Sequence, residues 1–232
     1  MIRFFCLNAF IAIFTIICCL WGLLLSGFDR SGRLIHYYVA APWARMILRV
    51  CGVKVVVKGR QNVDTDMPHI YMANHQSYFD IFTLLAYLPV DFKFILKQEL
   101  MKIPLFGHAM KRAGYIAINR EDPRKAVRSI NEAAKRIKNG TSVLIFPEGT
   151  RSVDGRLQSF KKGGFHLALK SGCDLLPVTI RNSHNIVPKG SLRVNRGIIT
   201  MTIGKPLPVK AYSKRNTDQL MNRVREAIMS QT

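Results

Sequence analysis

The chain has 232 residues, of which 48% are hydrophobic, and it carries 35 lysines and arginines against 14 aspartates and glutamates. Its apolar content, which includes 13 phenylalanines and 7 tyrosines, excludes an intrinsically disordered chain. The net charge of +21 requires an anionic partner, and nucleic acid, anionic lipid, an acidic protein or a phosphate-bearing substrate would each fit it.

The first predicted element is an apolar helix from Phe4 to Phe28, a stretch without a charged residue. A helix of this length spans about 37 Å, which is enough to cross a hydrocarbon core of roughly 30 Å. A cleaved signal peptide is the alternative, but its apolar region is usually shorter, so we expect a retained membrane anchor. The basic residues Arg30 and Arg33 follow the stretch and predict that the rest of the chain faces the cytoplasm.

A second segment, from Leu34 to Val50, mixes aromatic and aliphatic residues with His36, Arg45 and Arg49. This mixture predicts an amphipathic helix that lies at the level of the lipid headgroups. The alternative is a helix that packs on the folded core. We therefore predict a membrane anchor with an interfacial helix in residues 1–50 and one α/β domain in residues 51–232.

After Gly52, short β-branched runs alternate with helical patterns, which is typical of an α/β fold. Several runs are too apolar to have a solvated face, so we expect a mixed, largely parallel sheet flanked by helices. One helix is predicted to begin at Asp122 and stop at Gly140, and a final helix to run from Asn216 or Thr217 to about Ser230. The predicted strands are Val53–Lys58, His69–Ala73, Phe92–Leu96, Gly114–Ile118, Ser142–Phe146, Leu175–Ile180 and Gly197–Ile203.

The sequence Asn-His-Gln-Ser-Tyr-Phe-Asp at residues 74–80 directly follows a predicted strand and precedes an apolar run. If Ser77 caps the next helix, Asp80 is the third residue of that helix and its carboxylate points back toward His75. Such a carboxylate would fix the imidazole tautomer and leave the other ring nitrogen as a general base. A capping box beside an ordinary loop histidine accounts for the same pattern equally well.

The sequence Phe-Pro-Glu-Gly-Thr-Arg-Ser at residues 146–152 follows another apolar strand. Loops at strand ends bind ligands in α/β folds, and here Gly149 allows close backbone approach while Arg151 offers a planar fork for phosphate. A charged surface turn is the alternative. Further on, Lys161 lies at the start of a helical pattern where an anion could bind, although a solvated lysine is the alternative interpretation.

Four blocks in this order, at residues 74–80, 114–120, 146–152 and 175–180, resemble the lysophosphatidate acyltransferase family, the PlsC-type glycerolipid acyltransferases. The resemblance implies that His75 is the catalytic base and that Asp80 orients it. The family's second block often ends in Asp-Arg, whereas this chain has Asn119 before Arg120, which leaves the contribution of that position open. The predicted substrate-binding residues are Arg120, Glu148, Gly149, Thr150, Arg151 and Lys161, and the resemblance assigns Arg120, Glu148, Gly149 and Arg151 to the acceptor-phosphate site.

The resemblance implies a membrane enzyme of phospholipid biosynthesis that moves an acyl group from acyl-CoA or acyl carrier protein to the sn-2 hydroxyl of lysophosphatidate, giving phosphatidic acid. It implies direct transfer without an acyl-enzyme, and no cofactor or metal is expected. The expected partners are the lysophospholipid acceptor, the acyl donor and anionic membrane lipid, with no nucleic acid. The short form suits a bacterial inner membrane, with the catalytic domain facing the cytoplasm and the N-terminal helical pair anchored in one leaflet.

Other hypotheses remain open at this point. The acceptor could be another lysophospholipid or lipid, the enzyme could hydrolyse the thioester, or the chain could be a basic membrane-anchored binding protein. The sequence contains no helix-turn-helix, zinc-finger spacing or RNA-recognition motif, which disfavours nucleic acid as a partner.

The five cysteines are odd in number and lack paired spacing, which predicts reduced thiols and no zinc site. The stretch from Lys93 to Lys138 contains 12 basic residues and only 4 acidic ones. This excess of positive charge would attract anionic lipid, acidic acyl carrier protein or coenzyme A phosphates.

Overall fold

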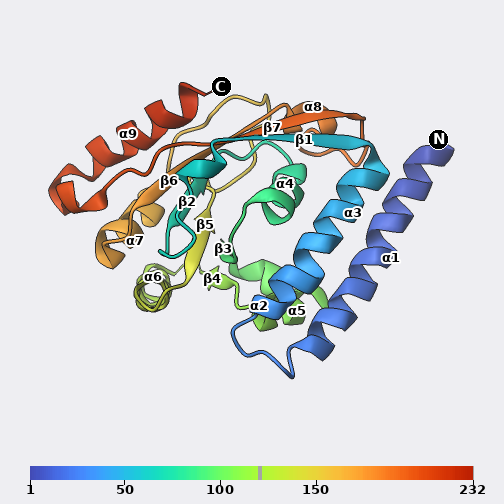
Figure 1. The fold of residues 1–232 in the computed structure, drawn as a ribbon, viewed down its shortest axis with the longest axis horizontal. Coiled ribbons are helices and arrows are strands. Elements are labelled where there is room, and N and C mark those ends of the chain that lie inside the picture. The colour runs from blue at the N-terminus through green and yellow to red at the C-terminus, as the bar shows by residue number, and fades with distance from the viewer. Residues whose placement is uncertain (120–121, 232) are drawn as a thin grey trace.

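The computed structural model describes residues 1–119 and 122–231. These residues form a seven-stranded sheet in the order β1-β7-β6-β2-β5-β3-β4 (Figure 1). Only the β6–β7 pair is antiparallel within the described residues, and the other neighbouring strands run parallel. The prediction of a mixed, largely parallel sheet is therefore confirmed. The strands are β1 (Val53–Lys58), β2 (Ile70–Ala73), β3 (Phe92–Lys97), β4 (Ile116–Ile118), β5 (Ser142–Ile145), β6 (Leu175–Arg181) and β7 (Gly197–Ile203).

The strand positions follow the apolar runs of the sequence, and the strands at the centre of the sheet are the most apolar. Every residue of β2 and β5 is buried, as expected for parallel strands covered on both faces. The outer strand β1 alternates between buried and more exposed positions because only one of its faces packs on the core. The predicted strand at 114–118 is shorter in the structure, since Gly114 has a φ of +80° and its N–H bonds to the carbonyl of Lys111 in a turn.

Helices cover both faces of the sheet (Figure 1). Tyr71 and Leu144 face one apolar core, which they share with residues of α1, α3 and α4. Their strand neighbours Ile70 and Val143 face a second core, which is closed by α6, α7 and α9. The main helices are α1 (Ile2–Leu25), α2 (Arg33–Ile35), the π-helical η1 (His36–Ala40), α3 (Ala41–Cys51), α4 (Phe79–Tyr87), α5 (Phe106–Arg112), α6 (Pro123–Lys138), α7 (Gly163–Ser171), α8 (Ser183–Ile186) and α9 (Thr217–Met229). The short 3-10 helices are η2 (Arg60–Asn62), η3 (Gln98–Lys102), η4 (Val209–Ala211) and η5 (Lys214–Asn216).

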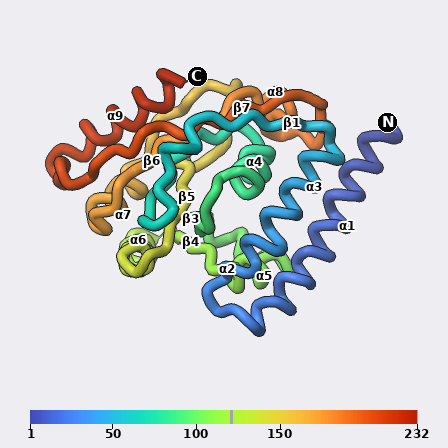
Figure 2. The backbone as a smooth tube through the Cα atoms, in the orientation of Figure 1, coloured from blue at the N-terminus to red at the C-terminus, as the bar shows by residue number. Residues whose placement is uncertain are grey.

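The N-terminal helix α1 lies on the outer side of α3, as the backbone trace shows (Figure 2). Among the described residues, it is the one helix long and apolar enough to cross a membrane, judged by length and composition. Large apolar side chains on its outer face, such as Ile17, Trp21 and Leu24, are about half exposed or more. A polar contact also joins α1 to α3, since the indole of Trp43 donates to the hydroxyl of Thr15 over 3.1 Å.

The segment predicted as an interfacial helix is built differently from that prediction. It forms three consecutive helical pieces, and Ala44, Ile47 and Leu48 of α3 are almost completely buried in the core that also contains α4. The inner face of α3 therefore packs on the domain, which was the alternative interpretation, and Tyr38 on η1 stays largely exposed. Gly52 ends α3 with a φ of +74°, a left-handed conformation that glycine adopts without strain. The division of the chain after residue 50 stays a prediction.

Candidate active site

The two polar motifs meet at one edge of the sheet because they follow neighbouring parallel strands. Residues 74–80 come after β2, and residues 146–152 come after β5, which pairs with β2 in parallel. A backbone hydrogen bond of 2.8 Å from the N–H of Ser152 to the carbonyl of His75 joins the two loops. Clefts outside the carboxyl ends of parallel strands are the usual ligand sites of α/β folds.

His75 and Asp80 form a direct hydrogen bond. Nδ1 of His75 lies 2.8 Å from Oδ2 of Asp80, and the backbone N–H groups of Gln76 and Ser77 donate to the same oxygen over 2.7 and 2.8 Å. The Asp80 side chain is completely buried, while the imidazole is 14% exposed. The hydrogen bond to Asp80 holds Nδ1 toward the protein, so Nε2 is the ring nitrogen available to a substrate.

The helix that carries Asp80 begins one residue later than expected. Tyr78 is the N-cap residue and Phe79 the first residue of α4, so Asp80 occupies the second helical position rather than the third. The carboxylate still reaches back, because the loop before the helix turns its N–H groups toward Oδ2. The hydroxyl of Ser77 accepts from the N–H of Phe79 over 3.2 Å, so the dyad and a capping arrangement coexist.

Buried side chains of the same motif fix the loop to distant parts of the chain. The amide of Asn74 exchanges two hydrogen bonds with the backbone of Ile180 on β6, at 2.8 and 2.7 Å. The hydroxyl of Ser77 donates to the carbonyl of Val187 over 2.8 Å. These contacts position the imidazole before any substrate binds, which is the preorganisation that acid–base catalysis requires.

The ring of Phe146 packs against one face of the His75 imidazole. The rings of His75 and Phe146 stack with centroids 3.8 Å apart and an interplanar angle of 12°. Because Phe146 begins the second motif, this stack joins the two motifs through side chains as well as through backbone. The stack and the bond to Asp80 together restrict the ring to one orientation.

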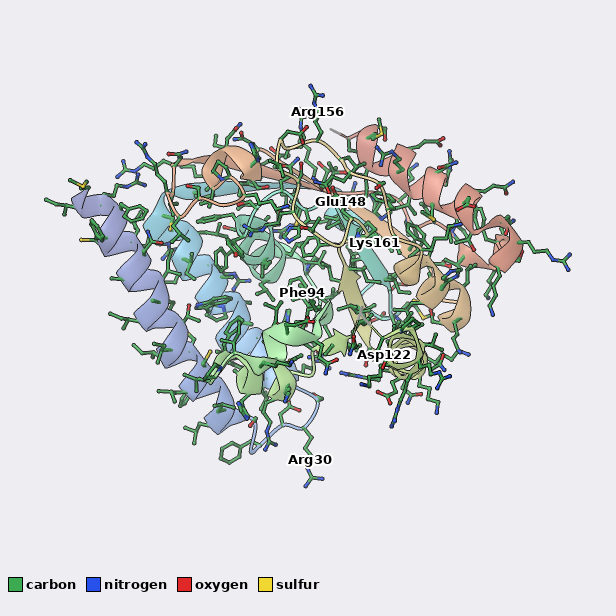
Figure 3. All side chains as sticks on the ribbon, turned by 180° about the vertical axis from the view of Figure 1, so that it is seen from behind. Arg30, Phe94, Asp122, Glu148, Arg156 and Lys161 are labelled. Atoms are coloured by element: carbon green, nitrogen blue, oxygen red, sulfur yellow. The ribbon has the colours of Figure 1, made fainter. Side chains whose placement is uncertain are left out.

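The carboxylate of Glu148 accepts hydrogen bonds from backbone N–H groups of the site. Its Oε1 accepts from the N–H of His75 over 2.6 Å, and its Oε2 accepts from the N–H of Gln158 over 2.8 Å. Burial raises the pKa of this carboxyl, while the two N–H bonds act against that shift. Figure 3 shows Glu148 in the interior, whereas Arg156 of the same loop projects outward. The structure thus places Glu148 behind the site, where it fixes the two loops to each other.

Arg151 is held on an aromatic ring. Its guanidinium carbon lies 3.7 Å from the centroid of the Tyr78 ring, within the range of a cation–π contact. Nη1 of Arg151 is buried and has no hydrogen-bond partner among the described residues. A buried guanidinium N–H without a partner is costly, so this group is suited to an anionic ligand that supplies an acceptor.

An apolar cavity of about 480 Å³ opens beside the imidazole. It extends from His75, Gly149 and Thr150 to residues of α1, α5 and η1, including Cys18 and Met110. Its lining is mostly apolar, and its polar members include His75 and Arg151 of the two motifs. This arrangement suits a ligand that has a long apolar chain and a polar reacting end.

The structure brings together most of the predicted site residues. His75, Gly149, Thr150 and Arg151 line the cavity, and Asp80 lies directly behind the imidazole. Among the described residues that line the cavity, Lys161 is not present, and its side chain is exposed. Arg120 lies outside the described residues.

Sequence reasoning missed the residues that support the site. Tyr78 stacks on Arg151, and Phe146 stacks on His75, although both belong to motifs that were already recognised. Their position in the sequence was a usable signal, because each is an aromatic residue in a motif that contains either the candidate base His75 or the candidate phosphate-binding residue Arg151. Trp43 and Thr15, which line the far part of the cavity, gave no such signal because their contribution depends on how α1 and α3 pack.

Comparisons with known proteins show which families and solved structures this chain is similar to. A family model described as Acyltransferase matches residues 54–181. A chloroplastic 1-acyl-sn-glycerol-3-phosphate acyltransferase of Arabidopsis thaliana is 41% identical over 78% of this chain and 51% of its own length. The 1-acyl-sn-glycerol-3-phosphate acyltransferase of Borreliella burgdorferi is 31% identical over 80% of this chain and 74% of its own length. This chain spans about half the length of the plant relative.

A solved structure is similar across almost the whole chain. The crystal structure of the 1-acyl-sn-glycerophosphate acyltransferase PlsC from Thermotoga maritima aligns with a TM-score of 0.82 and 30% sequence identity. The alignment covers 98% of this chain and 93% of that protein. The likeness includes the N-terminal helices as well as the sheet.

Proposed function

Because this chain belongs to the PlsC-type glycerolipid acyltransferase family, we propose that it transfers a fatty acyl group from a thioester donor to the free sn-2 hydroxyl of lysophosphatidate, giving phosphatidate. The observation that carries this proposal is the 2.8 Å bond between His75 and Asp80 beside a mostly apolar cavity that His75 lines. An oriented imidazole next to an apolar cavity supplies what acyl transfer to a lipid hydroxyl needs.

In this mechanism, Nε2 of His75 removes the proton from the acceptor hydroxyl. The oxygen attacks the carbonyl carbon of the thioester and forms a tetrahedral intermediate. The intermediate collapses, the carbon–sulfur bond breaks, and the departing thiolate takes the proton from the imidazolium. Asp80 keeps Nδ1 protonated and stabilises the positive charge that develops on the ring.

The cavity gives each part of the substrates a place. The apolar walls formed by α1, α5 and β3 suit the acyl chain, whose burial is worth about 0.8 kcal/mol per methylene. The guanidinium of Arg151 suits the phosphomonoester of the acceptor, because its planar fork can bind two phosphate oxygens. Gly149 and Thr150 line the same cavity as Arg151 and His75, so an acceptor whose phosphate binds Arg151 would lie in the cavity that the imidazole also lines.

We expect Arg151→Ala to raise the KM for lysophosphatidate by about two orders of magnitude, because it removes charge-assisted bonds to the phosphate. Tyr78→Ala should raise the same KM about threefold to tenfold, since it removes the cation–π contact that holds the guanidinium, whereas Tyr78→Phe keeps the ring and should change it little. The measurement is transfer of a labelled acyl group to acceptors with and without the phosphomonoester.

The same assay decides between acceptors and between transfer and hydrolysis. Wild-type protein should form acylated lysophosphatidate as the main product and little free fatty acid. If Arg151→Ala were equally active on both kinds of acceptor, the guanidinium would have no phosphate role. Free fatty acid as the main product in the presence of acceptor would favour a thioesterase instead.

The location that fits this function is a membrane surface. The exposed apolar face of α1 supports contact with lipid, and the net charge of +21 supports attraction to anionic headgroups. A bacterial inner membrane, with the catalytic domain on the cytoplasmic side, is the location we propose. Coenzyme A or acyl carrier protein would supply the thioester as a co-substrate.

A further inference from the structure

A second cavity, also of about 480 Å³, lies beside the first. It is bordered by η3, α5, β4 and α6, and cations from three of these elements line it. Lys102 comes from η3, Lys111 from α5, and Lys125 and Arg128 from α6. Figure 3 shows many nitrogen-tipped side chains around α6, whose N-cap residue Asp122 is labelled.

The positive charge of this cavity is only partly compensated. Lys125 pairs with Asp122 at 3.3 Å, and Arg128 pairs with Glu132 at 3.2 Å, both at exposed positions. Within the described residues, Lys102 and Lys111 form no ion pair, and both side chains are exposed. A concave site with two ammonium groups that form no ion pair and two further cations concentrates anions.

Tyr115 separates the two cavities and lines both of them. A series of aromatic rings leads from this tyrosine to the catalytic base. The ring centroids are 5.5 Å apart from Tyr115 to Phe94, 6.1 Å from Phe94 to Phe146, and 3.8 Å from Phe146 to His75. The cationic cavity therefore adjoins the cavity that His75 lines, at Tyr115.

We propose that this cationic cavity binds the phosphate end of the acyl donor. The proposal rests on the proposed function, because it requires that the second substrate is a pantetheine thioester. Coenzyme A and acyl carrier protein share one chemical feature near the thioester, a pantetheine arm that ends in phosphate. Four cations in a cavity match that phosphate, whereas the mostly apolar first cavity matches the acyl chain.

The length of the arm agrees with this placement. Between its sulfur and its phosphate oxygen the arm has about twelve bonds, as many as four extended residues, so it spans roughly 14 Å. That length is comparable to the three ring-to-ring steps that connect His75 to Tyr115. A donor whose carbonyl carbon lies at His75 would then have its phosphate near Tyr115, which lines the cationic cavity.

The test is a double variant, Lys102→Gln with Lys111→Gln, assayed with lysophosphatidate and three donors that carry the same acyl chain. The donors are acyl-CoA, acyl phosphopantetheine and the neutral acyl-N-acetylcysteamine. The KM for acyl-CoA should rise about tenfold, because two charge-assisted contacts to phosphate are lost. The neutral donor has no phosphate, so with this donor wild-type protein and the double variant should have nearly the same kcat/KM. The matched control is Lys205→Gln with Lys210→Gln, which removes two exposed lysines that border neither cavity.

The outcomes separate this inference from the proposed function. A loss with both acyl-CoA and acyl phosphopantetheine supports binding of the arm phosphate. A loss with acyl-CoA alone would assign the lysines to the nucleotide phosphates and would overturn the inference. An equal loss with all three donors, or a change in the KM for lysophosphatidate alone, would overturn the inference. Failure of wild-type protein to acylate lysophosphatidate from any donor would contradict the proposed function itself.

Discussion

His75→Ala is expected to lower kcat for acyl transfer by about 10²- to 10⁴-fold, which is the typical contribution of a positioned general base. The KM values should change much less, because the imidazole contacts the reacting hydroxyl while the phosphate and the acyl chain bind elsewhere. The measurement is the steady-state rate of acyl transfer to lysophosphatidate at saturating donor, with thermal unfolding recorded for the same preparations.

The unfolding data matter because the substitution also removes the stack on Phe146 and the bond to Asp80. A matched control is His108→Ala, which removes an exposed histidine of α5. It should keep the wild-type rate. Normal turnover by folded His75→Ala protein would exclude the imidazole as the base.

Asp80→Asn should lower kcat by about 10²- to 10⁴-fold while the fold is retained. An amide oxygen in the place of Oδ2 can still accept from Nδ1 of His75 and from the N–H groups of Gln76 and Ser77, so the loop keeps its anchors. The amide carries no negative charge, however, so it no longer stabilises the imidazolium that forms during the reaction. Rate measurement and thermal unfolding together separate the two effects.

Asp80→Ala is the variant to compare with Asp80→Asn. It should lose the same catalytic contribution and in addition destabilise the fold by about 2 kcal/mol, because two buried N–H groups lose a charged acceptor. If Asp80→Asn were as active as wild type, the carboxylate would serve only as a cap for α4. That result would support the capping alternative, which the sequence pattern alone left open.

The sheet was predictable because its central strands are buried on both faces. β2 and β5 are continuous apolar runs, and an apolar run of this length bounded by polar loops indicates a strand. The order of the strands was not predictable from such runs, since it depends on which edges pair after the helices have packed. The position of α3 shows the same limit, because Ala44 and Ile47 face α4 rather than lipid.

The candidate site was predictable to the extent that it depends on local spacing. The contact of Asp80 with the loop of His75 follows from the five-residue separation and from the turn before α4. Its precise form depends on distant contacts, such as the bond of Ser77 to the carbonyl of Val187, which spacing does not reveal. Glu148 was assigned to substrate from its motif, while the structure shows its oxygens occupied by backbone N–H groups.

The central claim is that His75 acts as a base in direct transfer and not as a nucleophile. The most direct measurement is the intact mass of the protein after it is mixed with acyl thioester in the absence of acceptor, followed by addition of lysophosphatidate. The account predicts an unchanged protein mass before the addition and acylated lipid after it. A covalent acyl adduct that forms on the wild-type protein, is absent from His75→Ala and disappears when acceptor is added would contradict it.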